Sequence, residues 1–177
     1  MSTRKLVLIA LIGSLAAVLM WFQFPLLPQA PFLEYDFSDI AVLTGTFSMG
    51  PAAGFLIATI KVGVFFLTKG KSGPIGALMN WTSTVLFVLV AGLFYWYLRR
   101  DRWGALGGMI LGTVVFTATM VFMNIYVALP LWGIPAEEIT GLVKAAVVPF
   151  NLLRGLISTT VTFLFYKKAS AIISRVL

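Results

Sequence analysis

The amino-acid sequence predicts an all-α integral membrane protein with six transmembrane helices, the second of them short, and with both termini in the cytoplasm. Two observations predict this class. Of the 177 residues, 60% are hydrophobic and only 11% are charged, whereas soluble domains carry about 25% charged residues. Several apolar runs exceed the roughly 18 residues that cross a bilayer. We expect residues 1–177 to form a single transmembrane domain.

Proline and glycine separate the first three predicted helices. The first runs from about Leu6 to Phe24, and no small-residue cleavage site follows it, so we expect it to be retained. PLLPQAP then breaks it. The second, about Ser38 to Ser48, reaches only about 16 Å, roughly half a bilayer. The sequence Met-Gly-Pro separates it from the third, about Ala52 to Leu67.

Three further helices are expected after the polar break TKGKSGP. The fourth runs from about Ile75 to Leu98 and ends at RRDR, and the fifth spans about Ala105 to Ala128. We expect Ile139 to Val148 to form a short helix near the membrane surface. Pro149 is then expected to open the last helix, which continues to about Tyr166.

The basic residues orient these helices. With a cytoplasmic N-terminus, eight Lys and Arg residues face inward and three lie in outer connections, which is a positive-inside bias. The inward set is Arg4, Lys5, Arg99, Arg100, Arg102, Lys167, Lys168 and Arg175, and the outer set is Lys69, Lys71 and Lys144. Topology therefore explains most of the net charge of +7, and nucleic-acid binding is not expected.

The residue types exclude much catalytic chemistry. Histidine and cysteine are both absent, which removes disulfides, thiolate and imidazole metal ligands, cysteine nucleophiles and histidine general bases. No pair of carboxylates stands at catalytic spacing on a shared helix face. We therefore predict no enzyme, no catalytic residue, no metal site and no cofactor.

Half of the carboxylates lie in the first outer connection, APFLEYDFSDI. We expect Ser38 or Asp39 to cap the short second helix by accepting from free backbone N–H groups. Glu34 and Asp36 are expected to stay near water and to pair with one of the three outer lysines.

Four polar residues are predicted just below the outer surface, on three helices: Asn80, Asn124, Asn151 and Arg154. Asn151 and Arg154 are three residues apart and so share a helix face. Amides and a guanidinium suit a ligand edge that carries carbonyls and ring nitrogens. Hydrogen bonding between helices explains the same residues equally well.

Aromatic residues are dense in the outer connections: Phe32, Tyr35, Phe37, Tyr126 and Trp132. An interfacial aromatic belt is the commoner use of such residues, although a planar ligand could stack on them. Lys61, in the middle of the third helix, is expected to have a structural role. It could reach the membrane interface, pair with a carboxylate such as Asp39, or bond to backbone carbonyls.

Small residues form a strip on the first helix. Ala10 and Ser14 are four residues apart, as are Gly13 and Ala17. Such a strip allows another helix to approach closely. The neighbour could be a helix of this chain or a helix of a partner.

Several motifs together make the chain similar to a known family. They are LPQAPFLEYDFSDIAVLTGTF after the first helix, MGPAAGFLIATIK at the third, Asn-Ile-Tyr late in the fifth and PFNLLRG at the sixth. With six helices, they resemble the substrate-binding S components of energy-coupling factor (ECF) vitamin transporters over essentially the whole chain. The run Pro-Phe-Leu-x-Tyr-Asp-x-Ser-Asp is fairly specific to the riboflavin-binding RibU type.

The resemblance implies a subunit that captures riboflavin, and also FMN as a secondary hypothesis, at the outer side of a prokaryotic cell membrane for ATP-driven uptake. In the family, this subunit docks onto a membrane coupling (T) component with two cytoplasmic ATP-binding subunits, which hydrolyse ATP. Matching positions imply that Asn124, Asn151 and Arg154 contact the flavin, with Leu33 to Phe37 closing over the ring. Arg154 stands where relatives carry lysine, which keeps the cation and changes its geometry.

The family's coupling motif on helix one, alanine-x-x-x-alanine, corresponds here to Ala10 with Ser14 or to Gly13 with Ala17. Two other functions remain compatible with the residues. The chain could bind another vitamin, such as thiamine, pantothenate or a queuosine precursor. It could also be a ligand-free membrane scaffold whose asparagines serve only helix packing.

Overall fold

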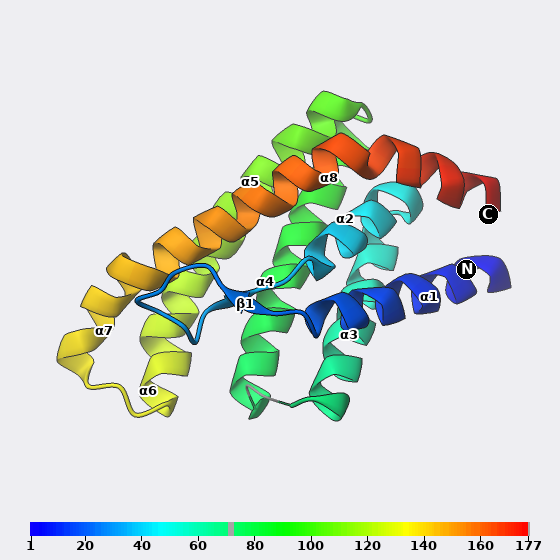
Figure 1. Cartoon of the computed structure of the whole chain (residues 1–177). Helices are drawn as coiled ribbons and strands as arrows, with labels where there is room; N and C mark the ends of the chain where they lie inside the picture. Colours follow the sequence, from blue (N-terminus) through cyan, green and yellow to red (C-terminus); the bar gives the residue numbers. More distant parts are fainter. Residues whose placement is uncertain (71–72, 177) are drawn as a thin grey trace.

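The computed structural model describes residues 1–70 and 73–176 and shows a helical bundle with one short strand pair (Figure 1). In chain order the elements are α1 (Thr3–Met20), β1 (Phe24–Pro25), β2 (Glu34–Tyr35), α2 (Ser38–Met49), α3 (Pro51–Thr68), α4 (Gly73–Leu93), the π-helix η1 (Phe94–Leu98), α5 (Arg102–Met123), the π-helix η2 (Asn124–Ala128), α6 (Leu129–Leu131), α7 (Ala136–Leu142), the π-helix η3 (Val143–Val147) and α8 (Val148–Val176).

The helical membrane class predicted from composition is confirmed. In the described part of the chain, five helical runs are long and apolar enough to cross a membrane, and α2, with 12 residues, is the short segment expected between the first two of them. The two chain ends lie near each other at one end of the bundle (Figure 1). Their cytoplasmic location stays a prediction.

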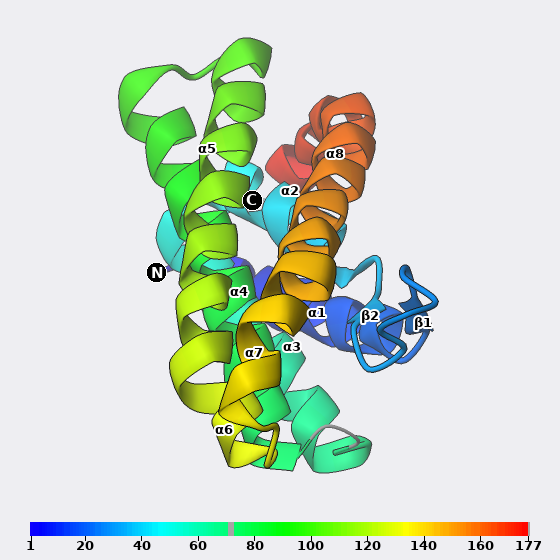
Figure 2. The same cartoon turned by 90° about the vertical axis from the view of Figure 1, so that its left-hand side faces the viewer.

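The short helix α2 is central to the bundle. It packs against α1, α3, α4 and α8, while the longer helices pack in the order α1, α3, α4, α5, α8 around it. Figure 2 shows α2 behind α8, with β1 and β2 projecting beside α1. Residues at the start of α2 can therefore reach three long helices at once.

The beginning of α2 corrects one expectation. Ser38 and Asp39 do not cap the helix: the N-cap residue is Phe37, whose side chain makes no capping bond, and the Ser38 backbone N–H donates to Oδ1 of Asp36 at 2.8 Å. Asp36 is consequently buried, with 6% of its surface exposed, and does not stay near water as expected. Gly50 ends the helix with φ of 100°, a conformation that favours glycine. Pro51 then opens α3.

The prediction of a separate short helix from Ile139 to Val148 is also wrong. α7, η3 and α8 follow one another without a break from Ala136 to Val176, and Pro149 lies inside this run. Proline normally disrupts a helix because it lacks an N–H and clashes with the carbonyl four residues earlier. The carbonyl four residues before Pro149 belongs to Ala145, which lies inside the wider turn of η3, where the regular hydrogen-bond pattern is already interrupted.

The small residues of α1 divide between two faces. Gly13 and Ala17 are buried, and a Cβ on Gly13 would lie 2.7 Å from Cγ2 of Ile60 on α3. This pair therefore serves packing within the chain. Ala10 and Ser14 are exposed on the outside of the bundle.

An aromatic cluster closes the connection between α1 and α2. Tyr35 on β2 makes edge contacts with Phe24 and Phe37, at ring-centroid distances of 5.7 and 5.4 Å. Its hydroxyl lies 3.2 Å from Oγ of Ser158 on α8. Burial raises the pKa of Tyr35 to about 12, although the hydrogen bond with Ser158 opposes this shift. The connection is thus anchored to the last helix by a neutral phenol.

Candidate functional site

A cavity of about 120 Å³ lies where α1, α3, α4, α5 and α8 meet the connection between α1 and α2. Five of the seven predicted ligand-binding residues line it: Leu33, Asn80, Asn124, Asn151 and Arg154. The other two, Tyr35 and Phe37, do not. Tyr35 is buried against Ser158, and Phe37 is 41% exposed on the outer side of the aromatic cluster.

Asn124 reaches the cavity from a π-turn, and Asn151 reaches it from α8, as the fourth residue after another π-turn. Asn124 opens η2, and its Nδ2 donates to the Met120 carbonyl at 2.8 Å. Asn151 follows η3, and its Nδ2 donates to the Val147 carbonyl at 2.8 Å. One amide hydrogen therefore fixes each side chain, while the amide oxygen and the second hydrogen remain for a ligand. Single π-turns inside α-helices are frequent at functional sites.

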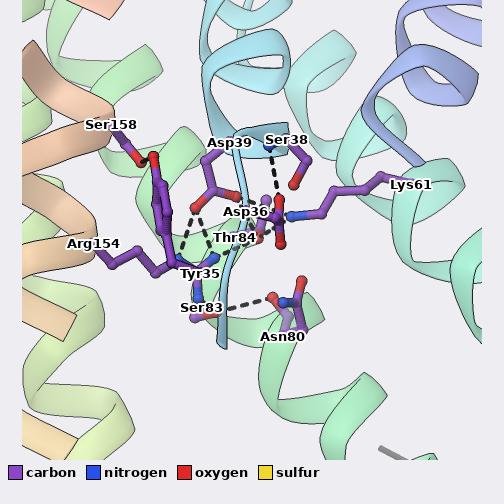
Figure 3. A network of polar contacts seen from close by, with 10 residues as sticks. All are labelled: Tyr35, Asp36, Ser38, Asp39, Lys61, Asn80, Ser83, Thr84, Arg154 and Ser158. Carbon is purple, nitrogen blue, oxygen red and sulfur yellow. Dashed lines mark hydrogen bonds and ion pairs between the residues drawn. The ribbon is translucent and has the colours of Figure 1, made fainter. Parts of the chain in front are cut away.

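Arg154 is held by a buried polar network (Figure 3). Its Nε and Nη2 lie 2.8 and 2.7 Å from Oδ2 of Asp39, at the start of α2. Nη1 donates to Oγ of Ser83 at 2.9 Å, and Nη2 also donates to Oγ1 of Thr84 at 3.0 Å. Three of the five guanidinium N–H groups thereby donate hydrogen bonds, one from each nitrogen, and Nη1 keeps a second N–H.

Lys61 belongs to the same network. Its Nζ lies 3.0 Å from Oδ1 of Asp39 and donates to Thr84 at 3.1 Å, with no exposed side-chain surface. Of the roles considered for this lysine, pairing with a carboxylate is confirmed. With Asp36 close by (Figure 3), two carboxylates balance two cations inside the bundle. Such a balance is needed because an isolated charge at membrane depth is costly.

The residues that sequence reasoning missed are the partners of Arg154. Asp39 was expected to cap a helix, and Ser83 and Thr84 carried no prediction. A signal was nevertheless present, since Ser83 and Thr84 lie three and four residues after Asn80 and so share its helix face. Gln23, after α1, also lines the cavity and was not predicted.

The connection from Pro31 to Glu34 separates this cavity from a second one. The second cavity, of about 410 Å³, shares Phe32, Glu34 and Trp132 with the first. Glu34 is only half-buried there, and Lys71, one of the three lysines expected to pair with it, lies outside the described residues. Lys69 instead donates to the Trp21 carbonyl at 3.0 Å.

The first cavity is small for a ligand site. Small-molecule pockets occupy roughly 300–1,000 Å³, so a drug-sized ligand needs more space than this cavity offers.

Comparison with known proteins identifies the family. Residues 4–166 match the model of the ECF transporter substrate-specific component. The chain belongs to this family. A solved structure described as the S component of a bacterial ECF transporter superimposes with a TM-score of 0.81, at 30% identity over 98% of this chain and 99% of that one.

Curated relatives of this S component carry riboflavin in their names. The riboflavin transporter RibU of Streptococcus thermophilus is 35% identical over 98% of this chain and 86% of its own length. RibU of Staphylococcus aureus is 28% identical over 98% and 94%. The riboflavin transporter FmnP of Bacillus subtilis is 30% identical over 95% and 93%. Proteins of this family bind substrate for a transporter, and the chain is not an enzyme.

Proposed function

We propose that this S component captures riboflavin at the outer side of a prokaryotic cell membrane for ATP-driven uptake. The observation that carries the proposal is the meeting of Asn124, from the π-turn η2, with Asn151 and Arg154, from α8, on one cavity. Riboflavin-named relatives that align over nearly the whole chain support the choice of ligand.

The chemistry of the cavity suits a flavin. A flavin ring system is apolar over most of its surface and has one polar edge with carbonyls, ring nitrogens and one N–H. Phe65, Met79 and Phe150 supply apolar walls, and the two asparagines offer donors and acceptors to the polar edge. The free N–H of Arg154 can donate to a carbonyl. A ligand that left these groups unpaired would bind more weakly, which gives selectivity.

The charges favour riboflavin over FMN. Among the described residues that line the cavity, Arg154 is the cation and Glu34 the carboxylate. Arg154 is already committed to Asp39, so little positive charge remains for a second anion. A phosphate monoester carries about −1.5 to −2 charges at pH 7. FMN would therefore gain little from Arg154 for the charge that its phosphate carries.

The connection between β1 and β2 acts as a lid in this proposal. Phe32, Leu33 and Glu34 line the cavity, and its volume is too small for a flavin unless these residues move outward. The adjoining second cavity provides space on the same connection. The Tyr35–Ser158 contact anchors the end of the lid nearest α2.

The proposed partners are a membrane T component and two cytoplasmic ATP-binding subunits, which would hydrolyse the ATP. Ala10 and Ser14 are the better candidates for the coupling face of α1, because they are exposed while Gly13 and Ala17 are buried against α3. Exposed small residues at this spacing let a partner helix approach closely in the bilayer.

A calorimetric ligand panel on the detergent-purified protein tests the proposal. Riboflavin should bind in a 1:1 complex and more tightly than FMN, while thiamine, pantothenate and a queuosine precursor should not bind. Binding of one of these other vitamins in place of riboflavin would transfer the chain to a different S-component specificity. A folded protein that bound none of the compounds would support a ligand-free scaffold instead.

A further inference from the structure

Two amide oxygens at the cavity have no hydrogen-bond partner. They are Oε1 of Gln23 and Oδ1 of Asn80, and both are buried and unpaired among the described residues. Gln23 and Asn80 also both line the cavity. A buried polar atom without a partner costs free energy, so native proteins rarely retain one without a reason. A ligand that supplies hydrogen-bond donors would satisfy both.

These oxygens come from other elements than the proposed ring-binding residues. Gln23 follows α1, and Asn80 is on α4, whereas Asn124 ends α5 and Arg154 is on α8. The cavity thus offers amide groups from η2 and α8, and two unpaired acceptor oxygens from α4 and from the chain after α1.

We infer that Gln23 and Asn80 form the subsite for the hydroxyl-bearing chain of the ligand. The inference rests on the proposed function and names the residues that recognise the polyol. Both oxygens can only accept hydrogen bonds. The polar edge of a flavin ring consists mainly of acceptors, which would repel them, whereas each hydroxyl of the ribityl chain can donate. Gln23 in addition places a ligand contact directly after α1, the helix proposed to meet the partner.

The test compares riboflavin with lumiflavin, which has a methyl group in place of the ribityl chain. Gln23→Met and Asn80→Leu remove the amides with little change of volume. Each should weaken riboflavin binding by about 3- to 10-fold, the effect of one neutral hydrogen bond. Lumiflavin binding should stay the same within error. Binding is followed by quenching of flavin fluorescence, with the protein in detergent micelles.

Gln29→Met is the matched control, because Gln29 is exposed in the same connection. It should change the affinity for neither flavin. The melting temperature of the ligand-free protein should stay constant or rise in Gln23→Met, since an unpaired buried oxygen is removed. A lower melting temperature would mean that the oxygen serves the fold, and it would overturn the assignment.

Two other results would also overturn it. Equal weakening of riboflavin and lumiflavin would place the amides at the ring. Unchanged riboflavin affinity in both variants would mean that water satisfies the oxygens, and the inference would fail while the proposed function stood. Failure of the unmodified protein to bind either flavin would instead refute the proposed function and the subsite with it.

Discussion

The ion network around Asp39 predicts a large effect for Asp39→Asn. Its two oxygens accept from Arg154 at 2.8 Å and from Lys61 and Thr84 at 3.0 Å, with 2% of the side chain exposed. The substitution leaves two buried cations facing a neutral amide. Removing one partner of a buried ion pair costs about 3–5 kcal/mol. For a chain of this length, the melting temperature should therefore fall by on the order of 10 °C.

The assay is unfolding of the protein in mild detergent, by SDS titration and by heat. Asp101→Asn is the matched control, because Asp101 pairs with Arg99 at 3.0 Å but both side chains are about half exposed, at 46% and 59%. Asparagine also keeps the cap on α5, where Asp101 accepts from the Gly104 N–H. We expect a much smaller change there, because water screens an exposed ion pair. Equal effects of the two substitutions would refute the reasoning.

Adding Lys61→Met to Asp39→Asn tests the balance of charges further. It removes one of the two cations that Asp39 neutralises, and Lys61 has no exposed side-chain surface through which water could compensate. Part of the lost free energy of unfolding should return, because the double variant retains one cation, Arg154, near Asp36. A double variant less stable than Asp39→Asn would show that Lys61 contributes by packing instead.

Three further predictions concern packing, the ligand and pH. Gly13→Val should destabilise the protein by about 1–3 kcal/mol in SDS titration, because its side chain would overlap Ile60. Ser14 is exposed, so Ser14→Val should change the free energy of unfolding by no more than about 0.5 kcal/mol and should weaken only co-purification with the T component. A stable Gly13→Val and a destabilised Ser14→Val would refute the assignment of Gly13 to internal packing and of Ser14 to the partner. Asn151→Ala should weaken riboflavin binding about tenfold by fluorescence titration without lowering the melting temperature, and unchanged affinity would remove Asn151 from the site. Tyr35 should ionise only near pH 12 in an ultraviolet titration, and the folded protein should therefore lose stability as the pH rises from 10 to 12. Tyr35→Phe should lack the ionisation near pH 12. The same titration curve in both proteins would contradict the assignment to Tyr35.

The sequence predicted the helical class and the polar residues of the cavity because both depend on local signals. Apolar runs and their proline or glycine breaks located the long helices, and the cost of a polar side chain in the bilayer marked Asn124, Asn151 and Arg154. The same cost put pairing with a carboxylate such as Asp39 among the three roles considered for Lys61.

Other features depend on three-dimensional packing and could not be predicted from local signals. Nothing in the spacing indicates that Asp39 at the start of α2 faces Arg154, 115 positions later, instead of capping its own helix. The π-turn η3 likewise allows Pro149 to stay inside a continuous helix, against the usual rule for proline. Which small residues of α1 face α3 also depends on the rotation of one helix against the other.

The most direct test of the central claim is the absorbance spectrum of the protein after purification in detergent from riboflavin-containing medium. The account predicts a yellow protein with a flavin spectrum and one flavin per chain, retained through washing. A colourless, folded protein that takes up no riboflavin when the vitamin is added would contradict it.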